Sequence, residues 1–323
     1  METPKLITLG EPLLRLMPPQ QRRFGQSESL ELYVGGSEAN TAVGLARLGI
    51  AVRYLTRLPE QAWGRYIEQT LRGQGVDTRF IAWTPEGRVG LYFVEEGLAP
   101  RPSQVIYDRA GSAFSAIQPT DLPESAFNWS ETWLHLTGIT LALGTSARAT
   151  CERALAVAQA QWGRRFSFDL NYRAKLWTPD EARHTCQPFM AQAALIFSAE
   201  RDARHLYGLE GEAQQVIQQL GAHFPQAQII MTCGANGALA WTAGEMLAQS
   251  AIPASERGRI GRGDAFAAGV LAAHLRGEAL PDALRWGVAC AALKSSIAGD
   301  IALLDEAEMR ALLEQSGANG IQR

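Results

Sequence analysis

The sequence predicts an α/β fold in which a doubly wound, mostly parallel sheet is flanked by helices and carries a small β-sheet lid. The main observation is that short apolar runs, typical of strands buried on both faces, alternate with runs of helical period. A second observation is that two regions, at approximately 12–35 and 88–115, interrupt this alternation. We therefore expect a single domain over 1–323, with the lid formed from the two interrupting regions.

Composition limits the classes of protein to which the chain can belong. Its 323 residues are 46% hydrophobic and 20% charged, as in ordinary globular proteins, and the formal net charge of −3 gives no reason to expect nucleic acid or an anionic membrane as a partner. The N-terminus lacks the apolar segment of a secretory signal, and no run of about 18 apolar residues predicts a membrane span. The four cysteines include no CxxC pair, so we expect a cytoplasmic protein without disulfides or zinc.

The elements of the main domain follow from continuous apolar runs and from helical spacing. In the first helix, Ala42, Val43, Ala46 and Leu48 form an apolar face, and Gly49 is a typical stop. Strands are expected at 5–10, 52–58, 132–139, 165–172, 194–198 and 228–234. Helices are expected at 39–48, 64–74, 146–162, 179–191, 212–223, 265–276, 280–297 and 305–315.

The second interrupting region has the pattern of a β-hairpin. The segments VGLYFVEE and SQVIYDR alternate bulky and polar residues, and the Gly- and Pro-rich GLAPRP separates them. Together with the first region, this hairpin predicts a lid that excludes water from a reaction site. The alternative is two ordinary surface excursions.

The segment GRIGRGDAFAAG places an acid at the start of a helix of small apolar residues. Gly261 and Gly263 let their backbone N–H groups approach a ligand closely, and the unpaired N–H groups of a helix start favour an anion. Asp264 would repel a stable phosphate, but it suits contact with a hydroxyl group that attacks one. The alternative is that Asp264 is a helix N-cap.

A second glycine turn, TCGANGAL, follows the strand at 228–234. Gly234 and Gly237 make room for a nucleotide or form a plain turn. The sequence contains no GxxxxGK[ST] motif, which excludes a P-loop, and no GxGxxG opens the first helix, which weakens a dinucleotide-binding interpretation.

A third segment, VGGSEANTAVGLARLG, begins the first helix. Gly35 and Gly36 form a tight turn, and Glu38 and Asn40 then lie at the helix start, where a polar side chain can reach a sugar hydroxyl. The alternative is a well-capped core helix.

Together, YVGGSEANTAVGLARLG and GRGDAFAAG resemble the ribokinase-like (PfkB) carbohydrate kinases. GEPLLRL, GLYFVEE, VIYDRAGSAFS, LHLTGIT, DLNYRAKLW and AGD are most similar to the branch that acts on 2-keto-3-deoxygluconate, and the likeness runs from Leu6 to about Leu313. The resemblance implies transfer of the γ-phosphate of ATP, with Mg²⁺, to the 6-hydroxyl of that sugar acid. It also implies a homo-oligomer.

The resemblance implies a role for each motif residue. Asp264 would accept the hydroxyl proton, and an unperturbed Asp, with a pKa of about 3.9, is ionised at neutral pH. The catalytic residues implied are Gly261, Arg262, Gly263 and Asp264. The substrate-binding residues implied are Gly35, Gly36, Asn40, Tyr92, Tyr107, Arg109, Arg173 and Asp300. The nucleotide-side residues implied are Asn171, Thr232, Gly234 and Gly237, and Glu200 is a candidate metal contact through water.

The two arginines of the implied substrate site favour an acid sugar. A guanidinium group matches a carboxylate, and each charge-assisted hydrogen bond contributes about 1.5–3 kcal/mol. Neutral sugars such as ribose and fructose carry no carboxylate for Arg109 and Arg173 to bind.

Three positions depart from the family pattern. Gly258 stands where most relatives carry an Asp that helps to hold a monovalent cation, which puts a potassium requirement in question. Arg262 stands where Ala or Gly is common; it either adds positive charge beside the phosphates or points to solvent, and we favour solvent. In SAERDA, Ala199 replaces a polar residue while the acids Glu200 and Asp202 remain.

Alternative functions stay open at this point. The chain could phosphorylate 2-keto-3-deoxygalactonate, fructose or ribose, or it could be a non-catalytic sensor of sugar acids. The Arg109 and Arg173 pair disfavours neutral sugars but does not separate the two acid epimers. Asp264 argues against a sensor, because a pure binder has little use for a carboxylate that faces a phosphate.

Overall fold

The computed structural model describes residues 5–97, 100–254 and 260–319, and it has an eight-stranded central sheet. The strand order is β14-β13-β12-β11-β10-β9-β1-β4, and all neighbours from β12 to β4 are parallel, as the sequence predicts. The strands are β1 (Leu6–Leu9), β4 (Val52–Leu55), β9 (Trp133–Thr137), β10 (Phe166–Asp169), β11 (Leu195–Ala199), β12 (Gln228–Thr232), β13 (Ala238–Thr242) and β14 (Glu245–Gln249).

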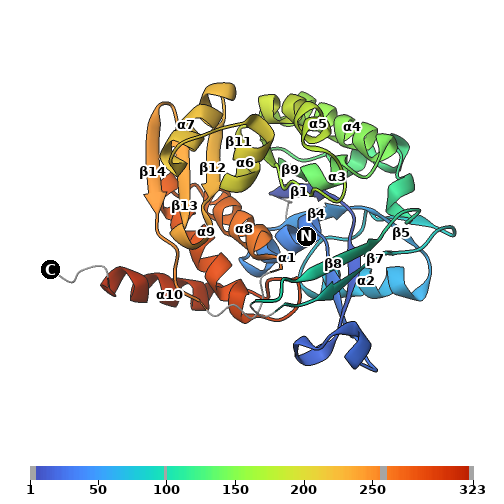
Figure 1. The fold of residues 1–323 in the computed structure, drawn as a ribbon. Helices are drawn as coiled ribbons and strands as arrows, with labels where there is room; N and C mark the ends of the chain where they lie inside the picture. Colours follow the sequence, from blue (N-terminus) through green and yellow to red (C-terminus); the bar gives the residue numbers. More distant parts are fainter. Residues whose placement is uncertain (1–4, 98–99, 255–259, 320–323) are drawn as a thin grey trace.

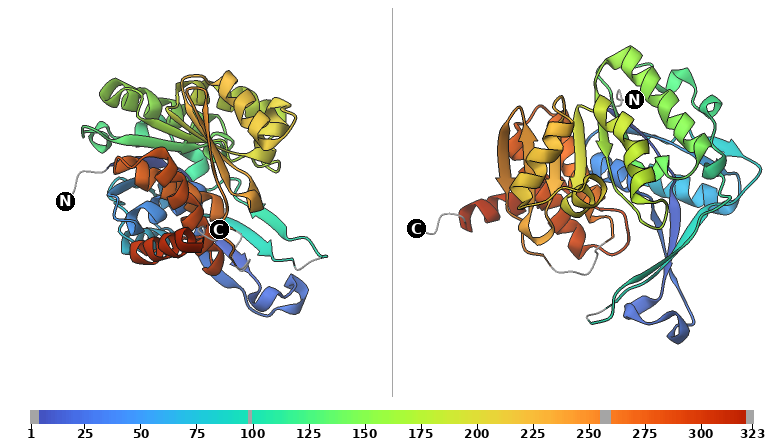
Figure 2. Two further views of the ribbon diagram at one scale, coloured as in Figure 1. Left: turned by 90° about the vertical axis from the view of Figure 1, so that its left-hand side faces the viewer. Right: turned by 45° about the horizontal axis from the view of Figure 1, so that its top comes forward.

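Helices cover both faces of this sheet, and Figure 2 shows the green and yellow helices on one side and the blue and red helices on the other. The strands are apolar throughout because alternate residues enter two different cores: in β11, Leu195 and Phe197 pack into one core and Ile196 into the other. The helices are α1 (Ser37–Arg47), α2 (Ala62–Gly73), α3 (Gly138–Leu141), α4 (Thr145–Trp162), α5 (Pro179–Gln192), α6 (Glu200–Tyr207), α7 (Ala213–His223), α8 (Arg262–Leu275), α9 (Leu280–Ser296) and α10 (Glu306–Asn319).

The two interrupting regions supply four strands that form a sheet of their own, which we call the lid. Its order is β3-β2-β7-β8, and β7 pairs with β8 as the predicted antiparallel hairpin. Figures 1 and 2 show these strands projecting from the main body. The lid strands are β2 (Leu13–Met17), β3 (Glu31–Gly35), β7 (Gly90–Glu95) and β8 (Gln104–Asp108).

The structure contains elements that the apolar pattern does not predict. β13 and β14 form an antiparallel hairpin at one sheet edge, where the Ala-rich segment ALAWTAGEMLAQ gives only a weak strand pattern. β5 (Arg57–Pro59) and β6 (Ala82–Thr84) pair as a third, two-stranded sheet. Within the described residues, no helix has the length and hydropathy that a membrane crossing requires.

An arginine lies fully buried in β4 and joins three separate segments. Both Nε and Nη2 of Arg53 donate to Oδ2 of Asp77, at 2.8 and 2.7 Å, and Nη1 donates to the carbonyl of Ala126 at 2.9 Å. The guanidinium carbon lies 4.1 Å from the ring centroid of Phe80 and 3.9 Å from that of Trp129. The charge is thus hydrogen-bonded and stacked between two aromatic rings, which compensates its burial.

Arg53→Met is expected to lower the free energy of unfolding by about 3 kcal/mol. This is the lower end of the range for a broken buried pair, because Asp77 keeps its bond to Arg79 at 2.8 Å. Urea denaturation measures the free energy of unfolding, and we expect the m-value to stay unchanged. Arg153→Met is the matched control: Arg153 and its partner Glu124 are 46% and 80% exposed, so the change should cost less than about 1 kcal/mol. Equal effects would show that the burial of Arg53 does not matter.

Candidate functional site

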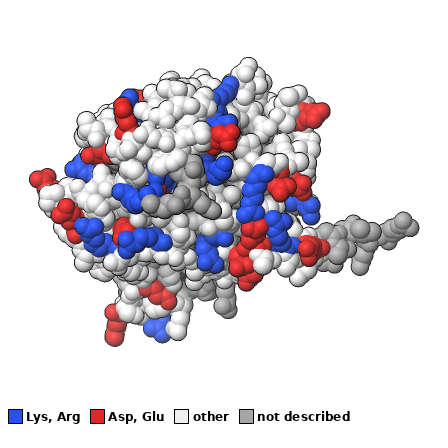
Figure 3. Space-filling model, turned by 180° about the vertical axis from the view of Figure 1, so that it is seen from behind, with Lys and Arg blue, Asp and Glu red and all other residues white. Residues whose placement is uncertain are grey.

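A cleft of about 1070 Å³ lies where the carboxyl ends of β10, β11 and β12 face the lid and the start of α8. Crevices at the carboxyl ends of parallel strands are where α/β sheets bind ligands. Figure 3 shows the molecule from behind the view of Figure 1, and on that face Lys and Arg side chains lie interspersed with Asp and Glu side chains. The predicted residues that line the cleft are Gly36, Asn40, Tyr92, Tyr107, Arg109, Asn171, Arg173, Glu200, Thr232, Gly234, Gly261, Arg262, Gly263, Asp264 and Asp300.

The start of α8 forms one wall of the cleft. The helix begins at Arg262, and Gly261 before it has a φ of 81°, a conformation that favours glycine. A Cβ at Gly261 would lie 2.1 Å from the carbonyl oxygen of Asp300, so glycine is also required by the close approach. The first N–H groups of α8 therefore face the cleft without side chains in between and form an anion-binding turn. Arg262 lines the cleft and is half-buried, so both the added positive charge and the contact with solvent stay predictions.

The start of α1 holds the carboxylate of Asp264. Asp264 is only 7% exposed. The hydroxyl of Ser37 donates to Oδ1 and the amide of Asn40 donates to Oδ2, both at 2.7 Å. The amide of Asn171 in turn donates to the Ser37 hydroxyl at 2.7 Å. Asp264 is the third residue of α8 and its oxygens bind another helix, so the N-cap alternative is wrong.

Burial raises the pKa of Asp264, while the hydrogen bonds from Asn40 and Ser37 and the charge of Arg173 lower it. The expectation of an unperturbed Asp is therefore wrong. Desolvation by the surrounding helices disfavours the charged form, and the donors on α1 partly restore it. The result is a carboxylate that is fixed in place and more basic than a free Asp, as a proton acceptor needs to be.

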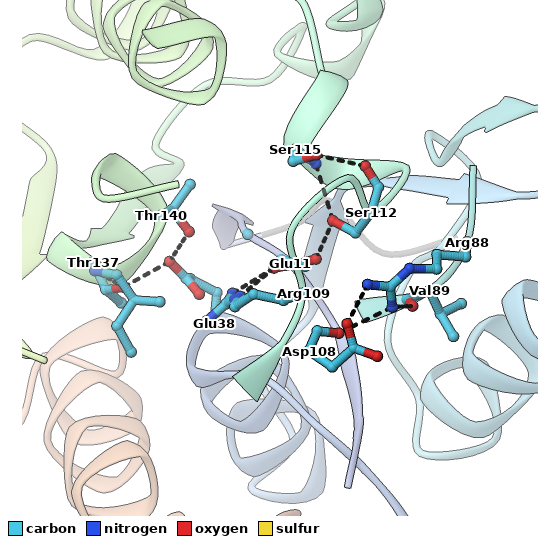
Figure 4. A network of polar contacts seen from close by, with 12 residues as sticks. Glu11, Glu38, Arg88, Val89, Asp108, Arg109, Ser112, Ser115, Thr137 and Thr140 are labelled. Atoms are coloured by element: carbon cyan, nitrogen blue, oxygen red, sulfur yellow. Dashed lines mark hydrogen bonds and ion pairs between the residues drawn. The ribbon is translucent and has the colours of Figure 1, made fainter. Parts of the chain in front are cut away.

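Glu38 does not face the cleft, contrary to the expectation that it reaches a sugar hydroxyl. It is buried, and its Oε1 accepts hydrogen bonds from the hydroxyls of Thr137 and Thr140, at 2.7 and 2.5 Å (Figure 4). Burial raises its pKa to about 7. Gly36 directly precedes α1 and has a φ of 130°. A Cβ at this position would lie 2.5 Å from the carbonyl oxygen of Glu11. Glu38 is therefore a core residue, in line with the alternative of a packed helix.

Arg109 is already paired within the protein. Its Nε and Nη2 donate to Oε2 of Glu11, at 2.8 and 2.5 Å, and the hydroxyl of Ser112 donates to Oε1 of the same carboxylate at 2.5 Å (Figure 4). Both the pair and Ser112 are buried. Glu11 thus neutralises the charge of Arg109. That Arg109 binds a substrate carboxylate stays a prediction, and Arg109 does line the cleft.

Arg173, unlike Arg109, has no carboxylate partner among the described residues. Its guanidinium lines the cleft, and its one hydrogen bond within the described residues runs from Nη1 to the backbone carbonyl of Tyr172, at 3.1 Å. None of the ion pairs among the described residues includes it. Arg173 thus brings a positive charge to the cleft that no neighbouring carboxylate neutralises at contact distance.

Two of the predicted substrate residues bind each other. The hydroxyl of Tyr92, on β7, donates to Oδ2 of Asp300, and Nε of Arg15, on β2, lies 2.9 Å from Oδ1. Burial raises the pKa of Asp300 to about 7. The rings of Tyr92 and Tyr107 lie 6.1 Å apart on the lid. Gly35 does not line the cleft; a Cβ there would meet the carboxylate of Asp300, so it makes room for that contact.

The nucleotide-side residues lie at two places. Thr232 and Gly234 line the cleft at the end of β12, whereas Gly237 lies in the turn to β13 and does not. Asn171 lies in the Asp264 network instead. Glu200 accepts two hydrogen bonds from Arg204 at its Oε1, at 3.0 and 2.6 Å, and its contact to a metal through water stays a prediction.

The described part of the chain holds no group of three His, Cys, Asp or Glu side chains that is arranged for a metal ion. Gly258, which departs from the family pattern, lies outside the described residues.

Sequence reasoning missed four residues of the site: Glu11, Arg15, Ser37 and Ser112. Glu11 follows the first strand directly, in GEPLLRL, and an acid at the carboxyl end of a predicted strand is a usable signal. Ser37, Arg15 and Ser112 give no comparable signal, because their importance depends on partners far away in the sequence.

Comparisons with known proteins cover almost the whole chain. A family model described as pfkB family carbohydrate kinase matches residues 4–307. A 2-dehydro-3-deoxygalactonokinase of Haloferax volcanii is 36% identical over 321 residues, 99% of this chain and 100% of the relative. The crystal structure of 2-dehydro-3-deoxygluconokinase from Thermotoga maritima is 31% identical, with a TM-score of 0.91 over 97% of this chain and 99% of that one. A double-mutant fructokinase from Vibrio cholerae, in a fructose, ADP and potassium ion bound form, is 26% identical with a TM-score of 0.83, over 97% and 99% of the two chains.

Proposed function

The chain belongs to the pfkB family of carbohydrate kinases, and from this premise we propose that it transfers the γ-phosphate of ATP to the 6-hydroxyl of 2-keto-3-deoxygluconate. The observation that carries the choice of an acid sugar is Arg173, a cleft cation with no ion-pair partner among the described residues. Its charge acts on Asp264, so a bound carboxylate and the reacting hydroxyl would lie in the same cleft. The galactonate epimer, named in the Haloferax relative, is the second candidate substrate.

In the proposed reaction, Asp264 accepts the proton of the 6-hydroxyl as its oxygen attacks the γ-phosphorus. Ser37 and Asn40 hold the carboxylate oriented toward the cleft, which lowers the entropic cost of the step. The backbone N–H groups at 261–263 stabilise the charge that develops on the transferred group. Mg²⁺ carried by the ATP phosphates would neutralise part of that charge, and Glu200, which lines the cleft, would help to hold it through water.

The described residues do not fit a bound potassium ion of the kind that the Vibrio fructokinase contains. Next to the anion-binding turn, the carbonyl oxygens of Ile297 and Gly299 are bound by the ammonium group of Lys294, at 2.9 and 3.0 Å. The family resemblance implies an Asp at position 258, and this chain has Gly258 there, which brings no carboxylate. We therefore derive no step of the reaction through a monovalent cation.

A coupled assay of ADP release tests the proposed function with a panel of sugars at matched concentrations. We expect turnover with 2-keto-3-deoxygluconate, and the ratio of its kcat/KM to that of the galactonate epimer decides between the two acids. Turnover of fructose or ribose with none of either acid would overturn the acid specificity. Tight binding of an acid by calorimetry without turnover would instead support a sensor.

The rate is expected to fall as the pH decreases through the raised pKa of Asp264, because only the ionised form accepts a proton. Ser37→Ala removes a donor that stabilises the carboxylate, so the acid limb of the kcat profile should move to higher pH. Ser146→Ala is the control: its hydroxyl donates to the carbonyl of Ile117, outside the cleft, and the limb should stay in place. A limb that does not move in Ser37→Ala would show that Asp264 does not determine it.

A further inference from the structure

Lys294, on α9, is a fully buried lysine without a carboxylate partner. The chain has three lysines, and the other two, Lys5 and Lys175, are exposed. The ammonium group of Lys294 donates to the carbonyl oxygens of Ile297 and Gly299, and among the described residues no carboxylate lies within ion-pair distance of it. A buried charge is costly unless hydrogen bonds compensate it, and here two backbone carbonyls do so.

The position of this lysine ties it to the anion-binding turn. Its Cε lies 3.3 Å from the point where a Cβ of Gly261 would be, and the carbonyl of Asp300 approaches the same point from the loop after α9. The ammonium group therefore holds residues 297–299 directly beside the backbone that starts α8. A movement of this loop toward α8 would press on Gly261, because the carbonyl oxygen of Asp300 already occupies the place of a side chain there.

Burial and the charges of Arg15 and Arg262 lower the pKa of Lys294 to about 8, against the opposing effect of Asp264 and Glu96. The amine is therefore mostly charged at neutral pH and places a positive charge behind the N–H groups that would face a phosphate. Positive charge at such a point adds to the electrostatic stabilisation of a transferring phosphoryl group.

We propose that the Lys294 ammonium is a built-in cation, which fixes the anion-binding turn and supplies positive charge behind it, so that the enzyme needs no bound monovalent cation. Lys294 is a positioning residue, since it contacts neither substrate nor the reacting atoms. Its catalytic part rests on the proposed phosphoryl transfer. A covalently tethered cation is present at every salt concentration, so the activity should not depend on which monovalent ion is in the buffer.

The first test compares the wild-type rate in KCl with the rate in tetramethylammonium chloride at equal ionic strength. We expect the same kcat in both salts, because tetramethylammonium is too large to enter a carbonyl cradle. An activation by potassium of about tenfold or more, the size of effect expected from a missing electrostatic stabiliser, would overturn the proposal.

The second test uses Lys294→Met and Lys294→Ala. Lys294→Met keeps an apolar stem but removes the charge, and we expect kcat to fall about tenfold or more with little change in the KM for the sugar. Lys294→Ala leaves space for an ion, so potassium or ammonium should restore part of its kcat, whereas neither should restore that of Lys294→Met. Lys5→Ala is the matched control for loss of an exposed lysine and should behave as the wild type.

Thermal melting of the same proteins supplies a readout that needs no substrate. Potassium, compared with tetramethylammonium, should raise the Tm of Lys294→Ala and leave the wild type and Lys294→Met unchanged. A normal kcat in Lys294→Met, or the absence of any ion effect on Lys294→Ala, would overturn the proposal and leave Lys294 a packing residue. If the wild type phosphorylates none of the sugars, the proposed function fails, and the melting data still decide whether the ammonium takes the place of an ion.

Discussion

Asp264→Asn is expected to lower kcat by about 10²–10⁴-fold, the usual contribution of a general base. The substitution keeps the size of the side chain, and the Ser37 hydroxyl can still donate to the remaining oxygen. The buried Oδ1 of Asn40 has no hydrogen-bond partner in the described structure, so a flip of that amide would present an acceptor to the new NH₂ group. The variant should therefore fold with nearly unchanged stability and bind both substrates.

The measurement is steady-state kcat and KM for ATP and for the sugar acid, together with a thermal melt. Asp202→Asn is the matched control, because Asp202 is another buried acid of the cleft but is paired with the exposed Arg201 rather than with α1. A large loss in Asp264→Asn with a small one in Asp202→Asn would separate the loss of a specific base from the loss of negative charge in the cleft. A wild-type kcat in Asp264→Asn would remove the proton acceptor from the proposed reaction.

The architecture was predictable because the physical cause of each main strand lies within a few neighbouring residues. A strand such as LITL has apolar side chains on both faces, and such a strand is stable only where both faces are covered. Runs of this kind therefore predict a parallel sheet between two layers of helices. The β7–β8 hairpin was predictable from GLAPRP for the same local reason. The edge hairpin of β13 and β14 was not, because ALAWT and EMLAQ carry few β-branched residues and depend on pairing with β12 for their order.

The site was predictable where the chemistry lies in one motif and unpredictable where it lies in a pair. The glycines around Asp264 predict the anion-binding turn, because close backbone approach requires the absence of side chains. The bond between Arg109 and Glu11 joins residues 98 positions apart, and the bond between Tyr92 and Asp300 spans 208 positions. No local pattern reports such pairings.

These pairings change the interpretation of the substrate site. Arg109 and Arg173 looked equivalent in the sequence. Each lies in a motif, VIYDR or DLNYR, that resembles the same branch of the family. In the structure, Glu11 takes up the charge of Arg109, and this buried pair fixes the end of β8 against the segment after β1. Arg109 can still donate through its third nitrogen, but the charge that would select an anion comes from Arg173.

Arg173→Met is therefore expected to raise the KM for the sugar acid by about 10- to 150-fold, which corresponds to the loss of one charge-assisted hydrogen bond of about 1.5–3 kcal/mol. Because Arg173 also lowers the pKa of Asp264, the acid limb of kcat should move to higher pH, so the KM is compared well above that limb. Arg201→Met is the matched control, since Arg201 lines the same cleft but is 79% exposed and paired with Asp202. The decisive quantity is the ratio of kcat/KM for the acid to that for fructose, which should fall in Arg173→Met alone. An unchanged ratio would mean that the Arg173 charge does not select the substrate carboxylate, and the case for an acid sugar would lose its physical basis.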